Sequence, residues 1–214
     1  FGINNILCLT GDHQQFGDHP NAANVFDLDS TQLIQTVKLM RDEGKLLGGF
    51  EMKKRPEMFI GAAANPFADP YEIRVSRLAK KVAAGCQFIQ TQCIYNMEKF
   101  KDWMKGIRDR GLHQEVAILA GLTPMKNVGM ARYMKNRVPG IDVPDDIVER
   151  LAAFPKEKQA EEGIKICIEQ IEELKEEEGI KGFHIMAIEW EEKVPEIVEA
   201  AGLYPRPQLN GSGD

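Results

Sequence analysis

Small polar residues follow several apolar runs of this chain, in places where they could bind a ligand. Asp12 comes after the apolar run 5–10 and Gly11, and Gln92 ends the run 87–92. A lone carboxylate, an amide and glycines suit hydrogen bonding to a flat heterocycle, and they form neither a nucleophile–base triad nor a metal-ligand cluster. The plainer interpretation is that such residues only cap strands and start helices. For Asp12 and Gln92 together we favour function, because neither turn needs an acid or an amide.

A second candidate feature joins small residues to basic ones. The run 61–66, Gly-Ala-Ala-Ala-Asn-Pro, leaves room for a ligand to approach the backbone, and close helix packing is the alternative explanation. In the helix predicted next, the spacing of Arg74, Arg77 and Lys81 puts them near one face. A solvated helix face is the default interpretation, and a clamp for a pyrophosphate is the more specific one.

The elements that position these residues are short apolar runs alternating with amphipathic helical patterns. This alternation indicates parallel β/α units, whose functional groups gather at the carboxyl ends of the strands. Six strands are predicted, over residues 5–10, 58–63, 87–92, 116–121, 140–143 and 183–188, and the fifth of these is the weakest. Six units could build a doubly wound sheet, whereas a closed (β/α)8 barrel needs eight.

One helix boundary is marked by its capping residues. Asp29 can cap a helix that buries Ile34 and Val37, and Gln32 stands where a capping-box partner would. Gly44 marks the end of this helix.

Composition limits the classes of protein that fit. The 214 residues can bury a sizeable core, and a net charge of -6 argues against nucleic acid as the main partner. No apolar run approaches the roughly 18 residues that span a membrane, and no secretory signal opens the chain. The four cysteines form no C-x-x-C pair and sit mostly in apolar surroundings, so we expect reduced thiols in a cytoplasmic protein without a metal site.

Taken together, the apolar runs and their endings resemble the methylenetetrahydrofolate reductase family. The resembling segments are 5–12, 64–66 with Arg77, Lys80 and Lys81, 84–86, 88–92, 119–124 and 182–184. They follow the family order from about Ile3 to Pro205. The most specific parts are the Gly11-Asp12 and Thr91-Gln92 pairs at the ends of their strands.

The resemblance implies an α/β fold, a (β/α)8 TIM barrel that holds a flavin at the strand ends. It implies flavin-dependent reduction of 5,10-methylenetetrahydrofolate to 5-methyltetrahydrofolate by hydride transfer, in one-carbon metabolism and methionine biosynthesis. We expect one barrel domain over 1–204 with six β/α units, two further units before Phe1, and a tail over 205–214. The expected cofactor is FAD, with FMN as the alternative. The expected electron donor is NAD(P)H or a protein, and the expected state is an oligomer or a complex subunit.

The resemblance also implies roles for individual residues. Asp12 would lie by the flavin and the folate, where its charge tunes the flavin and helps stabilise the cationic iminium form of the substrate. Gln92 would hydrogen-bond the pterin, with Val128 and Trp190 as further substrate-binding positions. The implied cofactor-binding residues are Thr10, Gly11, Asp12, Asn65, Arg77, Lys80, Lys81 and Cys86.

The chain departs from the family pattern at several of these positions. Thr10 stands where Arg is common, Asn65 replaces a His, and Trp190 replaces an Arg that helps to hold folate in the family. The general-acid Glu of the family lies on the first barrel strand, which precedes Phe1 in this interpretation.

Two other functions fit the residues. A pterin-binding methyltransferase barrel also uses an acid to hold the pterin and needs no flavin. A non-catalytic barrel subunit of an electron-transfer complex could dock through the charged helix predicted over 156–178, although solvated helix faces are far commoner.

Overall fold

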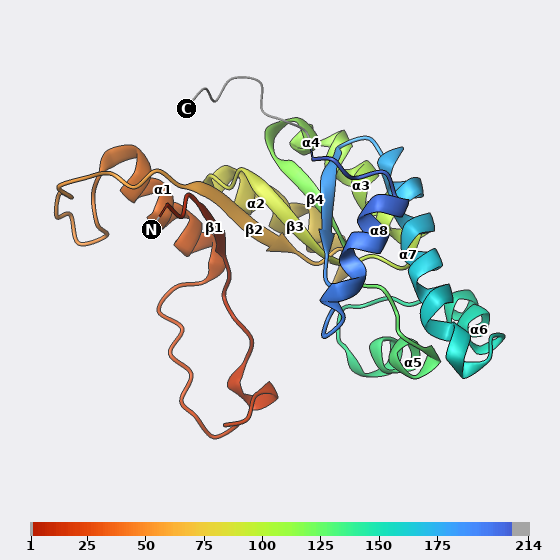
Figure 1. Cartoon of the computed structure of the whole chain (residues 1–214). Coiled ribbons are helices and arrows are strands. Elements are labelled where there is room, and N and C mark those ends of the chain that lie inside the picture. Colours follow the sequence, from red (N-terminus) through yellow and green to blue (C-terminus); the bar gives the residue numbers. More distant parts are fainter. Residues whose placement is uncertain (1, 207–214) are drawn as a thin grey trace.

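The computed structural model of the protein describes residues 2–206, and within them five parallel strands form one sheet (Figure 1). The strands are β1 (Asn5–Cys8), β2 (Phe59–Ala64), β3 (Phe88–Cys93), β4 (Ala117–Leu122) and β5 (Ile180–Ile185). Each strand pairs with the next in chain order, and helical segments lie between them. This arrangement is the parallel α/β fold that the alternating pattern predicts.

Eight α-helices are assigned among the described residues. They are α1 (Ser30–Glu43), α2 (Arg74–Ala84), α3 (Met97–Asp109), α4 (Leu112–Glu115), α5 (Val128–Arg137), α6 (Asp145–Ala152), α7 (Gln159–Lys175) and α8 (Val194–Ala200). The predicted capping box of α1 is present, because Asp29 and Gln32 exchange hydrogen bonds, and Gly44 ends the helix with a left-handed φ of 69°. No described helix is both long enough and apolar enough to cross a membrane.

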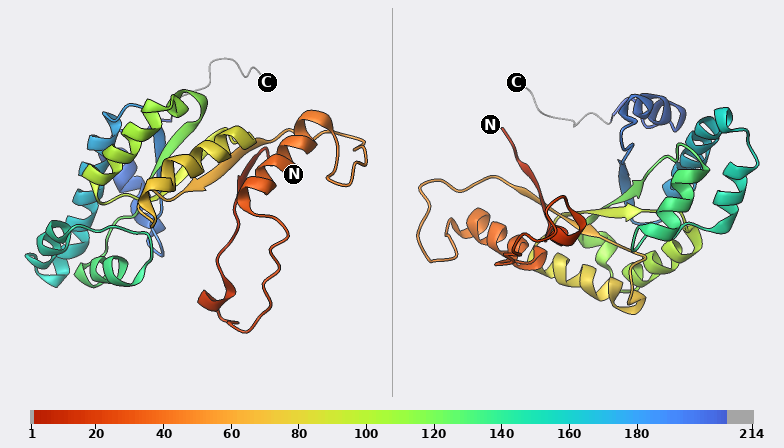
Figure 2. Two further views of the ribbon diagram at one scale, coloured as in Figure 1. Left: turned by 180° about the vertical axis from the view of Figure 1, so that it is seen from behind. Right: turned by 90° about the horizontal axis from the view of Figure 1, so that it is seen from below.

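The strands alternate between a covered outer face and an inner face. Ile60, Ile89 and Ile118 point outward and are 0% exposed, because the helices pack on that side. Seen from below, the strands form an open arc with helices along its outside (Figure 2). On the inner face, near the amino ends of β2 and β3, the rings of Phe59 and Phe88 stack with centroids 5.4 Å apart.

The predicted strand over 140–143 is wrong, so residues 2–206 contain five strands where the sequence pattern predicts six. Gly140 has a left-handed φ of 76°, and the Ile141 N–H donates to the Val138 carbonyl, so this segment is a turn. Val143 is buried in a second core cluster with residues of α5 and α6. Burial in that cluster explains the apolar pattern without a strand, and Pro144 supplies no N–H donor for a sheet.

The last strand lies three residues earlier than the predicted 183–188. A left-handed turn at Gly179 leads directly into β5 at Ile180. The Met186 N–H still donates to the Leu122 carbonyl at 2.7 Å, but Ile188 is 58% exposed beyond the sheet. Of the predicted tail over 205–214, residues 207–214 lie outside the described residues.

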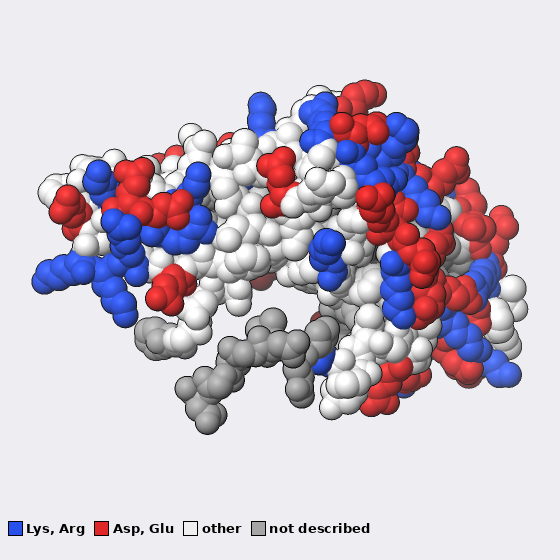
Figure 3. Space-filling model, turned by 90° about the horizontal axis from the view of Figure 1, so that it is seen from above, with Lys and Arg blue, Asp and Glu red and all other residues white. Residues whose placement is uncertain are grey.

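Seen from above, charged side chains of both signs are intermixed toward the two ends of the molecule, with mostly uncharged residues between them (Figure 3). Several of the surface charges on the helices form ion pairs, such as Lys101 Nζ with Glu173 Oε1 at 2.5 Å and Lys105 Nζ with Asp109 Oδ2 at 2.7 Å. Exposed pairs of this kind contribute little to stability. On the part of the molecule left uncovered in this view, acidic and basic side chains of the described residues alternate.

Candidate functional site

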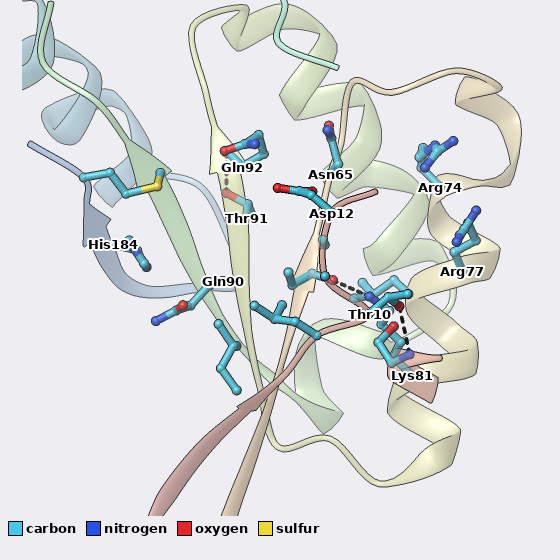
Figure 4. A pocket seen from close by; sticks show the side chains of 18 residues that line it. Thr10, Asp12, Asn65, Arg74, Arg77, Lys81, Gln90, Thr91, Gln92 and His184 are labelled. Atoms are coloured by element: carbon cyan, nitrogen blue, oxygen red, sulfur yellow. Dashed lines mark hydrogen bonds between the residues drawn. The ribbon is translucent and has the colours of Figure 1, made fainter. Parts of the chain in front are cut away.

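A cavity of about 560 Å³ lies at the carboxyl ends of the strands, on the inner face of the sheet (Figure 4). The structure brings seven of the predicted site residues to this cavity. They are Thr10, Gly11, Asp12, Asn65, Arg77, Lys81 and Gln92. Residues from β1, β2, β3 and α2 therefore converge, as expected where parallel strands end at one edge of a sheet.

The segment after β1 carries Asp12 to the mouth of the cavity. Gly11 has a φ of 85°, a left-handed conformation that glycine adopts without strain. Thr10 Oγ1 accepts a hydrogen bond from the Ser30 N–H at 2.9 Å, which ties this segment to the start of α1. Thr10 and Gly11 thus position the exposed carboxylate of Asp12, which Figure 4 shows near Asn65 and Gln92.

Asn65 shapes the loop between β2 and α2. Its Oδ1 accepts hydrogen bonds from the N–H groups of Phe67 and Ala68 at 3.0 and 3.2 Å. A Cβ added at Gly140 would lie 2.4 Å from Asn65 Nδ2, so the turn at Gly140 packs closely on this amide. Asn65 therefore has a clear structural role at the edge of the cavity, and only its amino group has hydrogen-bonding capacity left for a ligand.

One face of α2 lines the cavity with three cations, Arg74, Arg77 and Lys81. Arg74 is held by the Pro70 carbonyl, 3.1 Å from its Nε, and by the Asp69 carbonyl, 2.5 Å from its Nη2. Lys81 Nζ donates to the Ala63 carbonyl at 2.6 Å. Among the described residues, no carboxylate forms an ion pair with any of the three.

The electrostatics of this cationic face favour an anion. Burial lowers the pKa of Lys81, and the nearby Arg77 lowers it further. Burial and Arg77 likewise lower the pKa of Arg74. A phosphate placed against these groups would relieve the repulsion and accept charge-assisted hydrogen bonds.

The inner face of β3 and β5 supplies uncharged polar groups. Gln92 Oε1 accepts from the Cys93 N–H at 3.2 Å. Gln90 and His184 also line the cavity, although the sequence analysis assigns them no role. The signal for Gln90 was its position two residues before Gln92, because alternate residues of a strand share a face. Burial lowers the pKa of His184, which favours the neutral imidazole.

Four predicted site residues lie outside the residues that line this cavity. Lys80 is exposed and sits about 100° around α2 from Lys81, which turns it away from the cationic face. Cys86 is 4% exposed in the core at the amino end of β3, and its burial raises the pKa of the thiol to about 11. Val128 begins α5 and Trp190 follows β5, so both are on the strand-end side.

Trp190 packs against the main core and also contacts Lys126. Lys126 Nζ lies 6.0 Å from the centroid of the Trp190 ring and donates to the Glu189 carbonyl at 2.8 Å. Glu189 has a φ of 50°, a left-handed conformation that non-glycine residues rarely adopt. These contacts hold the loop after β5 against the loop after β4.

The arrangement is suited to binding rather than to nucleophilic attack. A phosphate-bearing ligand can bind the cations of α2, and a planar heterocycle can hydrogen-bond Asn65 and Gln92 beside Asp12. Within residues 2–206, no group of three or more His, Cys, Asp or Glu side chains could hold a metal ion.

Comparison with known proteins gives a consistent result. A sequence model described as methylenetetrahydrofolate reductase matches residues 1–202. Methylenetetrahydrofolate reductase 2 of Schizosaccharomyces pombe is 26% identical over 95% of this chain and 32% of its own length. The probable methylenetetrahydrofolate reductase (NADPH) of Caenorhabditis elegans is 22% identical over 95% of this chain and 29% of its own length. The chain thus spans about a third of the length of these curated relatives.

A solved structure supports the fold. It is an uncharacterized protein from Clostridium thermocellum whose description states that it binds two copies of 5-methyl-5,6,7,8-tetrahydrofolic acid. It superposes with a TM-score of 0.51 at 20% identity, over 68% of this chain and 52% of that protein. Because the family match extends over almost every residue of the sequence, this chain belongs to the methylenetetrahydrofolate reductase family.

Proposed function

We propose that this chain carries the flavin and folate site of an enzyme that reduces 5,10-methylenetetrahydrofolate to 5-methyltetrahydrofolate. The observation that carries the proposal is one cavity that holds Asp12 and Gln92 together with the cations of α2. The five strands would then form part of a (β/α)8 barrel, within the proposed domain 1–204. The folate ligand of the similar Clostridium thermocellum protein supports the substrate class.

The cavity fits a flavin because its cations lie at one end and its uncharged groups lie at the other. Arg77 and Lys81 would hold the phosphate end, as the resemblance implies, and Arg74 joins them because it lines the same wall. The backbone of Thr10 and Gly11 would lie beside the flavin ring. We propose FAD as the cofactor, with FMN as the alternative; when bound, it supplies the hydride.

Asp12 and Gln92 would act on the folate. A carboxylate at the mouth of the cavity stabilises positive charge that develops on the methylene iminium of the substrate, and it does so without moving a proton. The amino group of Gln92 remains available to orient the pterin, because within residues 2–206 only the Oε1 of this side chain has a hydrogen-bond partner. Val128 and Trp190 could contact only a part of the substrate that extends beyond the cavity.

The remaining parts of the proposal concern the enzyme as a whole. NAD(P)H or a protein would supply the electrons, and the enzyme would be a cytoplasmic oligomer or a subunit of a complex in methionine biosynthesis. A methyltransferase barrel is the competing function, but it gives no role to three cations that have no carboxylate partner among the described residues.

The test is a spectroscopic titration under anaerobic conditions. We expect the purified protein to take up flavin and become yellow, and 5-methyltetrahydrofolate to bleach the flavin band by donating a hydride to the ring. Colourless protein that takes up no flavin would contradict the proposal. Binding of methyltetrahydrofolate without flavin, with methyl transfer to a corrinoid, would favour the methyltransferase. Bound flavin without turnover, together with an electron-transfer partner that co-purifies, would favour a non-catalytic subunit.

A further inference from the structure

Two polar side chains on the inner face of the sheet have no place in the function proposed above. Gln90 on β3 and His184 on β5 both line the cavity, and Figure 4 shows them on the same side of the sheet. We propose that Gln90 and His184 form a second hydrogen-bonding subsite for the edge of a bound ring in which carbonyl groups alternate with N–H groups. Flavins and pterins share this edge, so the inference rests on the proposed function and deepens it.

The strand register places the two residues across β4 from each other. Gln90 pairs with Leu119 of β4, and His184 pairs with Gly121 two residues further on. Gly121 has no side chain, and a Cβ there would lie 2.2 Å from the Thr91 carbonyl oxygen. A residue larger than glycine is therefore excluded at position 121 of β4. The inner face next to His184 consequently carries no β4 side chain.

Two aromatic rings on the inner face limit the depth of the subsite. Two residues before Gln90, the ring of Phe88 covers Gly61 so closely that a Cβ at Gly61 would lie 2.1 Å from it. Phe88 also stacks on Phe59. These two rings form an apolar floor on the side of β2 and β3. A ligand ring that enters from the strand ends would thus meet the amide of Gln90 before it meets the apolar floor.

The described part of the chain leaves the hydrogen-bonding capacity of both side chains unused. Neither Gln90 nor His184 forms a side-chain hydrogen bond to another described residue, whereas the Oε1 of Gln92 bonds to the Cys93 N–H. Both are partly buried, and partly buried polar groups lose free energy unless a ligand or water satisfies them. An amide and a neutral imidazole each present a donor and an acceptor, which matches the mixed edge of a flavin or pterin.

The division of charge in the cavity supports a ring edge over a phosphate at this place. The cations that suit a phosphate lie on α2 beside β1 and β2, whereas Gln90 and His184 are uncharged and lie on β3 and β5 (Figure 4). A ligand with one anionic end and one heterocyclic end would span the cavity in this orientation. The subsite would then determine which ring the protein accepts.

The experiment compares Gln90→Leu and His184→Phe with Gln114→Leu, which removes an exposed amide on α4. Flavin affinity is measured by fluorescence titration, 5-methyltetrahydrofolate affinity by calorimetry, and the unfolding midpoint of the ligand-free protein by thermal denaturation. We expect Gln90→Leu and His184→Phe each to weaken one ring ligand by about 5- to 30-fold, with little change in the unfolding midpoint. The ligand that loses affinity identifies whether flavin or pterin occupies the subsite.

A conservative variant separates ligand binding from packing. His184→Gln keeps a donor and an acceptor, so it should retain more affinity than His184→Phe. Wild-type affinity for both ligands in Gln90→Leu and His184→Phe would overturn the inference and leave the proposed function intact. So would a lowered unfolding midpoint with unchanged affinity, because that result indicates a structural role. A wild-type protein that binds neither ligand would contradict the inference and the proposed function together.

Discussion

The two faces of the sheet are built from alternate residues of the same strands, yet they differ in composition and exposure. On the outer face, Ile60, Ile89 and Ile118 are 0% exposed under the helices. On the inner face, Gln90 and His184 line an open cavity. The comparison teaches that one face of each strand can stabilise the fold while the other is free to bind a ligand, because successive side chains point in opposite directions.

The composition of the inner face is informative in itself. When the interior of a barrel serves only as a core, bulky branched residues fill it in layers. Here Ala63, Gln90, Gln92 and His184 line the cavity alongside the apolar Leu7, Leu9, Leu78 and Met186, together with the strand-end segment that carries Asp12. The polar residues among these inward positions support the proposal that this interior binds a ligand. The comparison therefore predicts loss of stability from changes on the outer face and loss of binding from changes on the inner face.

The largest expected effect is on the outer face of β4. Ile118→Ala should lower the free energy of unfolding by about 2–5 kcal/mol, because it leaves a cavity in a closed core. The matched variant is Leu119→Ala, one residue along the strand and only partly buried on the inner face. Urea denaturation of both proteins provides the measurement. If Leu119→Ala were as damaging as Ile118→Ala, the distinction between the two faces would fail.

The next effect is expected at the mouth of the cavity. Asp12→Asn should keep the fold and lower kcat for methylenetetrahydrofolate about 100-fold, because it removes the charge that stabilises the cationic substrate. Asp18→Asn, an exposed acid further along the same loop, should leave kcat unchanged. Steady-state kinetics with unfolding curves separate the two outcomes. Wild-type turnover in Asp12→Asn would remove this carboxylate from the mechanism.

A smaller effect is expected on α2, where Arg77 lines the cavity and Lys80 does not. Arg77→Ala should weaken FAD or FMN binding about 10-fold and leave riboflavin binding unchanged, because riboflavin has no phosphate. Lys80→Ala should change neither affinity, since Lys80 is exposed outside the cavity. Fluorescence titrations with the three flavins give the comparison. An equal loss in both variants would place the phosphate on another face of the helix.

The smallest effect concerns the pH dependence of stability. Burial lowers the folded-state pKa of His184 below the ordinary histidine value of about 6.5, so the unfolded state binds more protons between these two pKa values. The stability that comes from the neutral imidazole is therefore present above pH 6.5 and is lost as the pH falls through the folded-state pKa. In urea denaturation at neutral pH and at about pH 5.5, His184→Gln should lose less stability on acidification than the wild type. An identical acid dependence in the two proteins would show that the imidazole titrates freely.

The fold was predictable where local signals agreed with one another. The first four strands lie within two residues of their predicted bounds at either end, and the capping box at Asp29 and Gln32 is formed as predicted. The strand predicted over 140–143 is wrong because Val143 is buried against α5 and α6 rather than in the sheet. An alternating apolar run indicates that its apolar side chains are buried. It does not indicate whether they pack within a sheet or against helices.

The residues that line the cavity were predictable at the strand ends but less so elsewhere. Asp12 and Gln92 follow apolar runs directly, and both line the cavity. Lys80 and Cys86 were assigned by position in the family pattern, and neither lines it. Gln90 and His184 lie inside strands. The sequence alone does not show whether a polar residue in a strand faces a cavity, solvent or another part of the protein.

By itself the sequence determined the class of the fold, the order of the β/α units and the polar residues that end the strands. These features are local. The apolar periods of strands and helices, the capping residues and the turn glycines can all be recognised in the sequence of a single chain. Only the tertiary structure decided which face of each strand borders the cavity and which cations of α2 reach it. Those outcomes depend on strand register and on the rotation of a helix against the sheet, and a shift of one residue in either would exchange the buried set of side chains for the ligand-facing one.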